Sequence, residues 1–214
     1  MKKYIVVIIL FTFMLPLAAF SQFSNYGVKF GVESAGAKNT PNFADGRLVG
    51  ISVYGFADLN ILRNISSTID LGVTQRGYTS SQIQTNEQGE FIKKVTATSR
   101  LTYISLAPFV NLDAPISGVS LFAGVAPRFD LLIYRSPGSY AFSGYYPAVK
   151  DQLPHYLNRS IFGASFAAGI KNVVIDHIGF RLEGKYEMDI TDSMSKYPAK
   201  YRNNVFMLVL GVNL

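Results

Sequence analysis

Apolar and polar residues alternate along most of the chain after residue 25. A period of two is typical of β-strands, because successive side chains of a strand point to opposite faces. The alternation is interrupted at intervals, and the interruptions divide the chain into eight segments. We predict one strand for each segment: 26–34, 47–59, 65–78, 98–112, 118–134, 159–171, 177–190 and 203–214.

The gaps between these segments alternate between long and short. In chain order they contain 12, 5, 19, 5, 24, 5 and 12 residues. An even number of antiparallel strands, with short turns at one side and long loops at the other, is typical of a transmembrane β-barrel. The pattern therefore predicts an all-β fold, an eight-stranded antiparallel up-and-down transmembrane β-barrel with short periplasmic turns and long outer loops.

The N-terminal residues have the features of an export signal. Lys2-Lys3 precedes an apolar run over residues 4–17, and Ala19-Phe20-Ser21 supplies small residues where a signal peptidase cleaves. A membrane-anchoring helix is the alternative, but the run is shorter than the roughly 20 residues that such a helix needs. We expect a cleaved signal peptide over 1–21 and a single barrel domain over 22–214, located in the outer membrane of a diderm bacterium.

Composition narrows the possible chemistry. The chain contains no cysteine, which excludes disulfides, thiolate metal sites and a lipid anchor on cysteine. Loss of Lys2 and Lys3 with the signal lowers the formal net charge from +6 to +4, and the basic residues form no cluster interleaved with aromatics. Nucleic acid is therefore not an expected partner. We expect no cofactor.

Charged residues gather on one face of the seventh segment, and apolar residues gather on the other. The face that contains Arg181, Glu183, Lys185 and Glu187 must point into the lumen of a barrel, since the other face meets lipid. If inward and outward positions alternate in the other segments as they do in the seventh, those segments add further charges to the interior. The predicted interior set is Lys29, Arg76, Arg128, Lys171, Arg181 and Lys185, with Glu33, Asp58, Asp70, Asp130, Glu183, Glu187 and Asp189.

This interior set is nearly neutral, and that balance predicts a closed lumen. An unpaired charge buried away from water costs several kcal/mol, so these residues need partners across the barrel. A conducting pore usually carries rings of one sign of charge. Eight strands also enclose a space only just wide enough for side chains to fill. We expect a lumen packed with ion pairs, and a small pore is the alternative.

Two prolines lie inside predicted strands. Pro108 falls in the fourth segment and Pro127 in the fifth, and proline cannot donate a hydrogen bond to a strand ladder. A closed barrel has no free edge on which such a residue could lie. We therefore expect a β-bulge at each proline.

Several local patterns resemble the PorT-like family of small outer-membrane β-barrel proteins. They are Ser21-Gln22, the opening 26–32, the central 103–108, the glycine-rich 162–171 and the closing 208–214. The resemblance covers nearly the whole chain after the signal. It implies an outer-membrane barrel and an accessory role in protein secretion or transport across that membrane.

The sequence contains no recognisable catalytic or metal-binding motif. His155 and His177 are the only histidines, and neither stands at the spacing of a known triad or metal site. The longest predicted loop, 135–158, is instead rich in aromatic residues, which contribute large contact areas at low entropic cost. We name Tyr140, Tyr145, Tyr146, His155 and Tyr156 as candidate binding residues of the outer loops.

These observations favour a non-enzymatic outer-membrane barrel with a structural or surface-exposed role. Ligands or partners would bind through the outer loops, because loops on a rigid scaffold commonly carry function. The expected partners are outer-membrane lipid, the barrel-assembly machinery and periplasmic chaperones during biogenesis, and an unidentified extracellular or envelope partner. A secretion accessory and a small pore are the alternatives.

Overall fold

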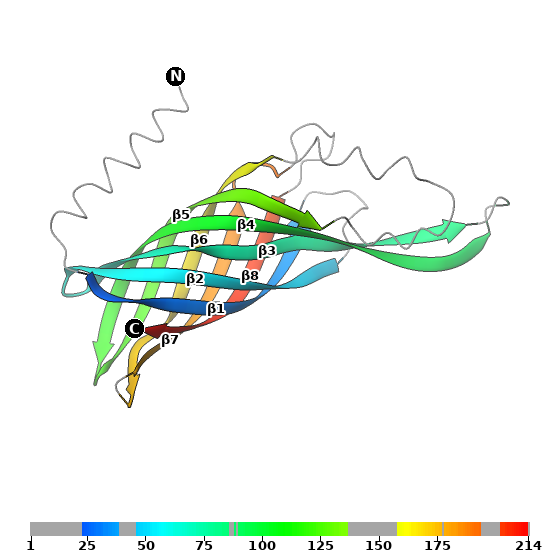
Figure 1. Cartoon of the computed structure of the whole chain (residues 1–214). Helices are drawn as coiled ribbons and strands as arrows, with labels where there is room; N and C mark the ends of the chain where they lie inside the picture. Colours follow the sequence, from blue (N-terminus) through cyan, green and yellow to red (C-terminus); the bar gives the residue numbers. More distant parts are fainter. Residues whose placement is uncertain are drawn as a thin grey trace, which may run out of the picture.

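The strands form a closed barrel in the computed structural model of the protein, which describes residues 23–38, 46–85, 88, 90–136, 158–176, 178–193 and 202–213. Each strand pairs antiparallel with its neighbours in sequence, and β1 also pairs with β8 (Figure 1). The predicted fold class is confirmed. The strands are β1 Phe23–Lys38, β2 Gly46–Leu62, β3 Ile65–Thr85, β4 Phe91–Ile116, β5 Val119–Ser136, β6 Ser160–Ile175, β7 Ile178–Asp189 and β8 Arg202–Asn213.

The two faces of the barrel wall differ in polarity. In β5, buried and exposed residues alternate without a break from Ser120 to Leu131. The outward positions form a continuous apolar surface, which would be costly in water and suits contact with lipid. Its exposed members include Phe30, Val32, Val49, Ile51, Leu71, Val125, Leu182, Leu208 and Leu210. Among the described residues there is no helix long and apolar enough to cross a membrane, a finding that says nothing of a β-barrel.

The connections differ in length between the two ends of the barrel. At one end, residues 63–64, 117–118 and 176–177 join β2 to β3, β4 to β5 and β6 to β7. Ser117 and Gly118 both have positive φ, as a tight two-residue hairpin turn requires. We call this the turn end, and β1 begins and β8 finishes there. The opposite end, where the longer connections lie, is the loop end.

The β3 and β4 strands extend beyond the barrel wall at the loop end. Pairing of β2 with β3 reaches Gly46 opposite Thr79, and pairing of β4 with β5 reaches Arg100 opposite Ser136. Farther out, residues 80–85 and 91–97 pair with each other as a two-stranded ribbon, the β3–β4 ribbon (Figure 1). The predicted loop 79–97 is therefore mostly strand. The alternation of apolar and polar residues did not predict these strands, because a ribbon outside the membrane needs no apolar face.

The prediction of a β-bulge at each of the two prolines is wrong. Register is unchanged on both sides of Pro108 and Pro127, and extrapolation of the β4–β5 register places the two prolines opposite each other. Pro108 pairs with Ile69 of β3, and Pro127 pairs with Ala164 of β6, without a shift. The missing N–H groups thus fall at the same point of one ladder. A single interruption between β4 and β5 accommodates both residues.

Bulges occur elsewhere and redirect side chains at the two ends. In β5, Ile133 is an extra residue between the pairs formed by Leu132 and Tyr134. In β6, Lys171 and Asn172 together face the single residue Arg181, and Asn172 has a φ of 63°. Bulges of this kind re-aim neighbouring side chains. The β6 bulge brings both Lys171 and Asn172 to the mouth of the barrel at the turn end.

We expect Leu182→Arg to destabilise the folded barrel in a bilayer by roughly 2–4 kcal/mol, since a cation near the mid-membrane on the lipid face is poorly solvated. Leu182 is 48% exposed and pairs with Ile170 and Leu210, which also face outward. The measurement is equilibrium unfolding in urea from lipid vesicles. Leu182→Ala is the control and should cost less. Equal stability of Leu182→Arg and the wild type would contradict the lipid-facing assignment.

Candidate functional site

The barrel interior is lined by charged side chains. Alternation along the strands directs every second residue inward, and all thirteen charges of the predicted interior set are there, each at most 5% exposed. Because such burial is costly for an isolated charge, the pairing of these residues decides what the lumen can do. Most of the charges fall into three groups along the barrel axis.

The group nearest the loop end is the arginine cluster: Arg76, Arg128, Asp130, Glu187 and Asp189. Arg76 crosses the lumen from β3, with Nη1 2.5 Å from Asp130 Oδ2 and Nη2 2.6 Å from Glu187 Oε2. Arg128 contacts the same two carboxylates, at 2.8 Å from Nε and 3.2 Å from Nη1. Its Nη2 also pairs with Asp189. Two planar guanidinium groups thus link carboxylates of β5 and β7, a geometry for which arginine is well suited.

The remaining oxygen of Asp189 connects the arginine cluster to the loop end. Oδ2 accepts hydrogen bonds from Ser193 Oγ at 3.0 Å, and from the backbone N and Nδ2 of Asn203 at 2.9 and 3.0 Å. These partners come from the connection after β7 and from β8. They fix the start of β8 against β7 above the cluster.

The middle group is the lysine cluster: Lys29, Asp70, Glu183 and Lys185. Lys29 Nζ lies 2.8 Å from both Asp70 Oδ1 and Glu183 Oε1. Lys185 pairs with the other oxygen of Asp70 and lies 3.5 Å from Glu183 Oε2. Two cations and two anions therefore alternate in a closed ring contributed by β1, β3 and β7. The ring is neutral as a whole.

Aromatic side chains complete the packing around the lysine cluster. The Phe56 ring lies between two cations, with Arg181 Cζ 4.1 Å and Lys29 Nζ 4.9 Å from its centroid. Lys185 Nζ lies 4.8 Å from the Tyr54 centroid and 5.1 Å from that of Phe109. Such cation–π contacts are strongest where water is absent. Arg181 also pairs with Asp58, whose Oδ1 accepts a hydrogen bond from Thr68 at 2.6 Å.

The third group lies at the turn end and includes a residue that the sequence analysis missed. Lys171 Nζ is 2.8 Å from Asp113 Oδ1, and it donates a 2.8 Å hydrogen bond to Ser66 Oγ. The predicted fourth strand stopped at residue 112, one position short of Asp113. Continuing the alternation from Phe109 and Asn111, both buried, would have placed Asp113 inward.

Glu33 differs from the other interior carboxylates. It is 1% exposed, and its Oε2 accepts a 2.7 Å hydrogen bond from Thr74. Among the described residues, no lysine or arginine lies within salt-bridge distance of it. An uncharged side chain of the same shape would be less costly at this position than a carboxylate without a cationic partner.

The lumen is closed to water along much of its length. Large side chains from several strands are fully buried. They are Arg76, Arg128, Arg181, Tyr54, Tyr103, Lys29, Phe109, Leu101, Ile161, Glu33 and Glu183. Paired charges and aromatic rings therefore fill the space that a channel would need.

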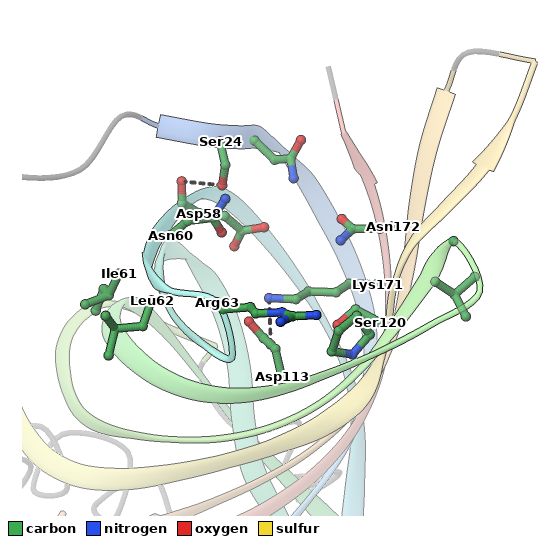
Figure 2. A pocket seen from close by; sticks show the side chains of 14 residues that line it. Ser24, Asp58, Asn60, Ile61, Leu62, Arg63, Asp113, Ser120, Lys171 and Asn172 are labelled. Atoms are coloured by element: carbon green, nitrogen blue, oxygen red, sulfur yellow. Dashed lines mark hydrogen bonds and ion pairs between the residues drawn. The ribbon is translucent and has the colours of Figure 1, made fainter.

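A pocket of about 660 Å³ opens at the turn end. Figure 2 shows Lys171 and Asp113 pointing toward each other in it, with Asn172 and Ser24 at its rim. Asn25 and Asn60 add further amide groups to the lining. Among the described residues, no group of three histidine or acidic side chains could hold a metal ion. The pocket is a polar mouth above the filled lumen.

The five candidate loop residues, Tyr140, Tyr145, Tyr146, His155 and Tyr156, lie outside the described residues, as does His177. The described part of the loop end instead contains a feature that sequence reasoning missed, the β3–β4 ribbon. Phe91 and Ile92 begin β4 there and are 66% and 53% exposed. Their apolar side chains are available for contact outside the barrel.

Comparison with known families and structures gives one family match. The sequence model of the outer membrane protein beta-barrel domain matches residues 20–195. No curated protein matches the sequence significantly.

Several solved structures are similar to this chain. Neisserial surface protein A (NspA) is 12% identical, with a TM-score of 0.49, 90% of this chain covered and 99% of that one. Ail of Yersinia pestis, in complex with the heparin analogue sucrose octasulfate, is 14% identical, with a TM-score of 0.44 and coverage of 90% and 100%. OprG from Pseudomonas aeruginosa is 6% identical, with a TM-score of 0.43 and coverage of 90% and 95%.

The different surroundings of two buried glutamates predict opposite responses to the same substitution. Glu187→Gln removes the anion shared by Arg76 and Arg128, and we expect it to lower the free energy of unfolding by roughly 3–5 kcal/mol. Glu33→Gln is the matched control and should leave stability unchanged or raise it, since Glu33 has no cationic partner among the described residues. Urea unfolding and heat-dependent gel mobility measure both. A larger loss for Glu33→Gln than for Glu187→Gln would contradict this pairing.

Proposed function

Since the chain belongs to the outer membrane protein β-barrel domain family, we propose that it is a non-enzymatic surface barrel with a sealed lumen. The barrel is then a rigid scaffold in the bacterial outer membrane, and recognition takes place at its loop end. The single observation that carries this proposal is the filled lumen. A conducting barrel needs an open path along its axis, whereas Arg76, Arg128 and Lys185 form ion pairs that cross this axis.

The absence of enzymatic activity is supported by the way the interior carboxylates are used. Asp130, Glu187 and Asp189 are each bound by arginine, and Asp70 and Glu183 are each bound by lysine. General acid–base catalysis needs a group within reach of a substrate. These buried groups have partners within the protein and no access for a substrate.

Recognition at the loop end is supported by the β3–β4 ribbon. Within the part of the chain that the structure describes, the outer edges of the ribbon pair with no other strand, and free strand edges can bind an extended segment of another protein. The exposed Phe91 and Ile92 add apolar contact area near its tip. The aromatic candidates Tyr140, Tyr145, Tyr146, His155 and Tyr156 would contribute from the adjoining connection. The partner would be an extracellular or envelope component.

Biogenesis would follow the route of exported barrels. The signal peptide over 1–21 would be cleaved, and periplasmic chaperones would deliver the chain to the barrel-assembly machinery. The turn end would then face the periplasm and the loop end the exterior, because outer-membrane barrels place their short turns inside. A PorT-like accessory role in secretion and a small pore remain the alternatives.

Planar-bilayer recording tests the sealed lumen. We expect the purified, folded protein to insert without stable stepwise conductance, because the arginine and lysine clusters leave no water-filled path. A porin reconstituted in the same bilayers is the positive control, and heat-dependent gel mobility verifies folding. Reproducible single-channel steps from the wild-type protein would favour the pore instead.

Single-cysteine labelling tests the orientation, since the wild-type chain has no cysteine. With a membrane-impermeant maleimide, we expect Asn86→Cys and Gly144→Cys to be labelled in intact cells. Gly118→Cys, in the β4–β5 turn, should be labelled only after the outer membrane is permeabilised. Labelling of Gly118→Cys in intact cells would reverse the proposed orientation and leave the sealed-lumen proposal standing.

A further inference from the structure

The pocket at the turn end is lined by widely separated parts of the chain. Its residues come from the start of β1, the end of β2, the β2–β3 and β4–β5 turns, and the adjoining ends of β4, β5 and β6. A volume of about 660 Å³ is large enough for a small ligand. Asp58, one of the lining residues, is buried and paired with the buried Arg181. The pocket therefore ends at the filled lumen, and a molecule that enters it stays at the mouth.

Four charged residues line the pocket, and three of them already have partners. Asp58 binds Arg181, and Lys171 Nζ lies 2.8 Å from Asp113 Oδ1. Arg63, on the β2–β3 turn, is exposed and makes no hydrogen bond or ion pair through its side chain to any described residue. Figure 2 shows the Arg63 side chain extending into the opening toward Lys171 and Asp113. The described lining thus offers one unpaired cation to a negatively charged ligand.

Three side-chain amides also line the pocket: Asn25 on β1, Asn60 on β2 and Asn172 on β6. None of these amides is hydrogen-bonded to another described residue. Asn60 and Asn172 lie on opposite sides of the opening (Figure 2). An asparagine side chain has two N–H donors and a carbonyl acceptor. The lining therefore has donors and acceptors for a ligand that contains amide groups.

A carboxylate next to several amide groups is the chemistry of the C-terminal end of a peptide. A guanidinium can bind both oxygens of such a carboxylate through charge-assisted hydrogen bonds. One unpaired cation also suits the single charge of a carboxylate better than the nearly double charge of a phosphate group. The described lining contains no aromatic side chain, so it has no ring on which an aromatic ligand would stack.

We propose that the turn-end pocket binds the C-terminal end of a peptide chain, with the carboxylate on Arg63 and the last peptide groups on the three amides. The Lys171–Asp113 pair, to which Ser66 adds a hydrogen bond, keeps the adjoining part of the lining neutral. A short free peptide and the tail of a protein end in the same groups, and either is a possible source. Binding to the detergent-solubilised barrel depends neither on its orientation nor on conductance, so this proposal and the proposed function fail independently.

Titration of the isotope-labelled, detergent-solubilised barrel with N-acetyl-trialanine, followed by nuclear magnetic resonance, tests the site. We expect saturable shifts of the backbone signals of Gly118, Ser120 and Asn172, and none in the β3–β4 ribbon. The same peptide with a C-terminal amide should bind about tenfold more weakly, because it has no charge for Arg63. A folded protein that ends in three alanines separates the two sources. Binding equal to that of the peptide adds protein tails to the ligands, and weaker binding assigns the site to free peptides.

Two variants test the assigned contacts. Arg63→Gln removes the charge at an exposed turn position, and we expect it to bind the free-acid peptide about tenfold more weakly and to lose the preference for acid over amide. Asn172→Gly allows the positive φ of 63° and removes one amide, and it should weaken binding about threefold. Arg100→Gln is the matched control, an exposed arginine at the loop end, and should bind within about twofold of the wild type. Heat-dependent gel mobility verifies that each variant is folded.

Four results would overturn the proposal. They are the absence of saturable binding, equal binding of the acid and the amide, wild-type affinity of Arg63→Gln, and displacement of the peptide by acetate at equal concentration. The last of these would show a small-anion site in which the amides take no part. The first would show that Arg63 and the three amides are only solvated at the barrel mouth.

Discussion

Closure of the sheet by pairing of β1 with β8 is the constraint on which the rest of the structure depends. In a bilayer there is no water to satisfy the backbone groups of an open edge, so a sheet can cross it only as a closed barrel. The β1–β8 ladder runs from Gly27 opposite Asn213 to Lys38 opposite Arg202 and removes the last free edges within the wall. Once closed, the barrel has an interior that cannot expand, and its side chains must fill that space and satisfy one another.

The interior meets this demand with ion pairs and aromatic rings. Replacing such networks with apolar side chains can leave stability equal or higher, whereas breaking them is costly. The arginine and lysine clusters join β1, β3, β5 and β7, strands that are not neighbours in the wall. They therefore link distant parts of the barrel across its axis. This cross-linking gives the loop end a rigid base that carries the β3–β4 ribbon.

The sequence by itself determined the number of strands, their approximate positions and the eight-stranded barrel. It did so because alternation with a period of two and the order of long and short gaps are local properties of the chain. The alternation along residues 178–190 also separates one charged and one apolar face without any knowledge of neighbouring strands. Tertiary structure decided everything that depends on register. Pro108 and Pro127 share one ladder interruption only because β4 and β5 align them, which no local pattern reveals.

The same distinction applies to individual interior residues. The sequence gives the sign of each charge, but the choice of Asp130 and Glu187 as partners of Arg76 depends on three strands whose offsets are fixed by closure. Glu33 has the same side chain as Glu187 and the same inward phase, yet only Glu187 reaches an arginine. The β3–β4 ribbon likewise depends on pairing between two segments that lack the membrane pattern. Which residues form ion pairs is therefore decided by the closed barrel. Closure brings together residues that are far apart in the chain, at distances that no single strand specifies.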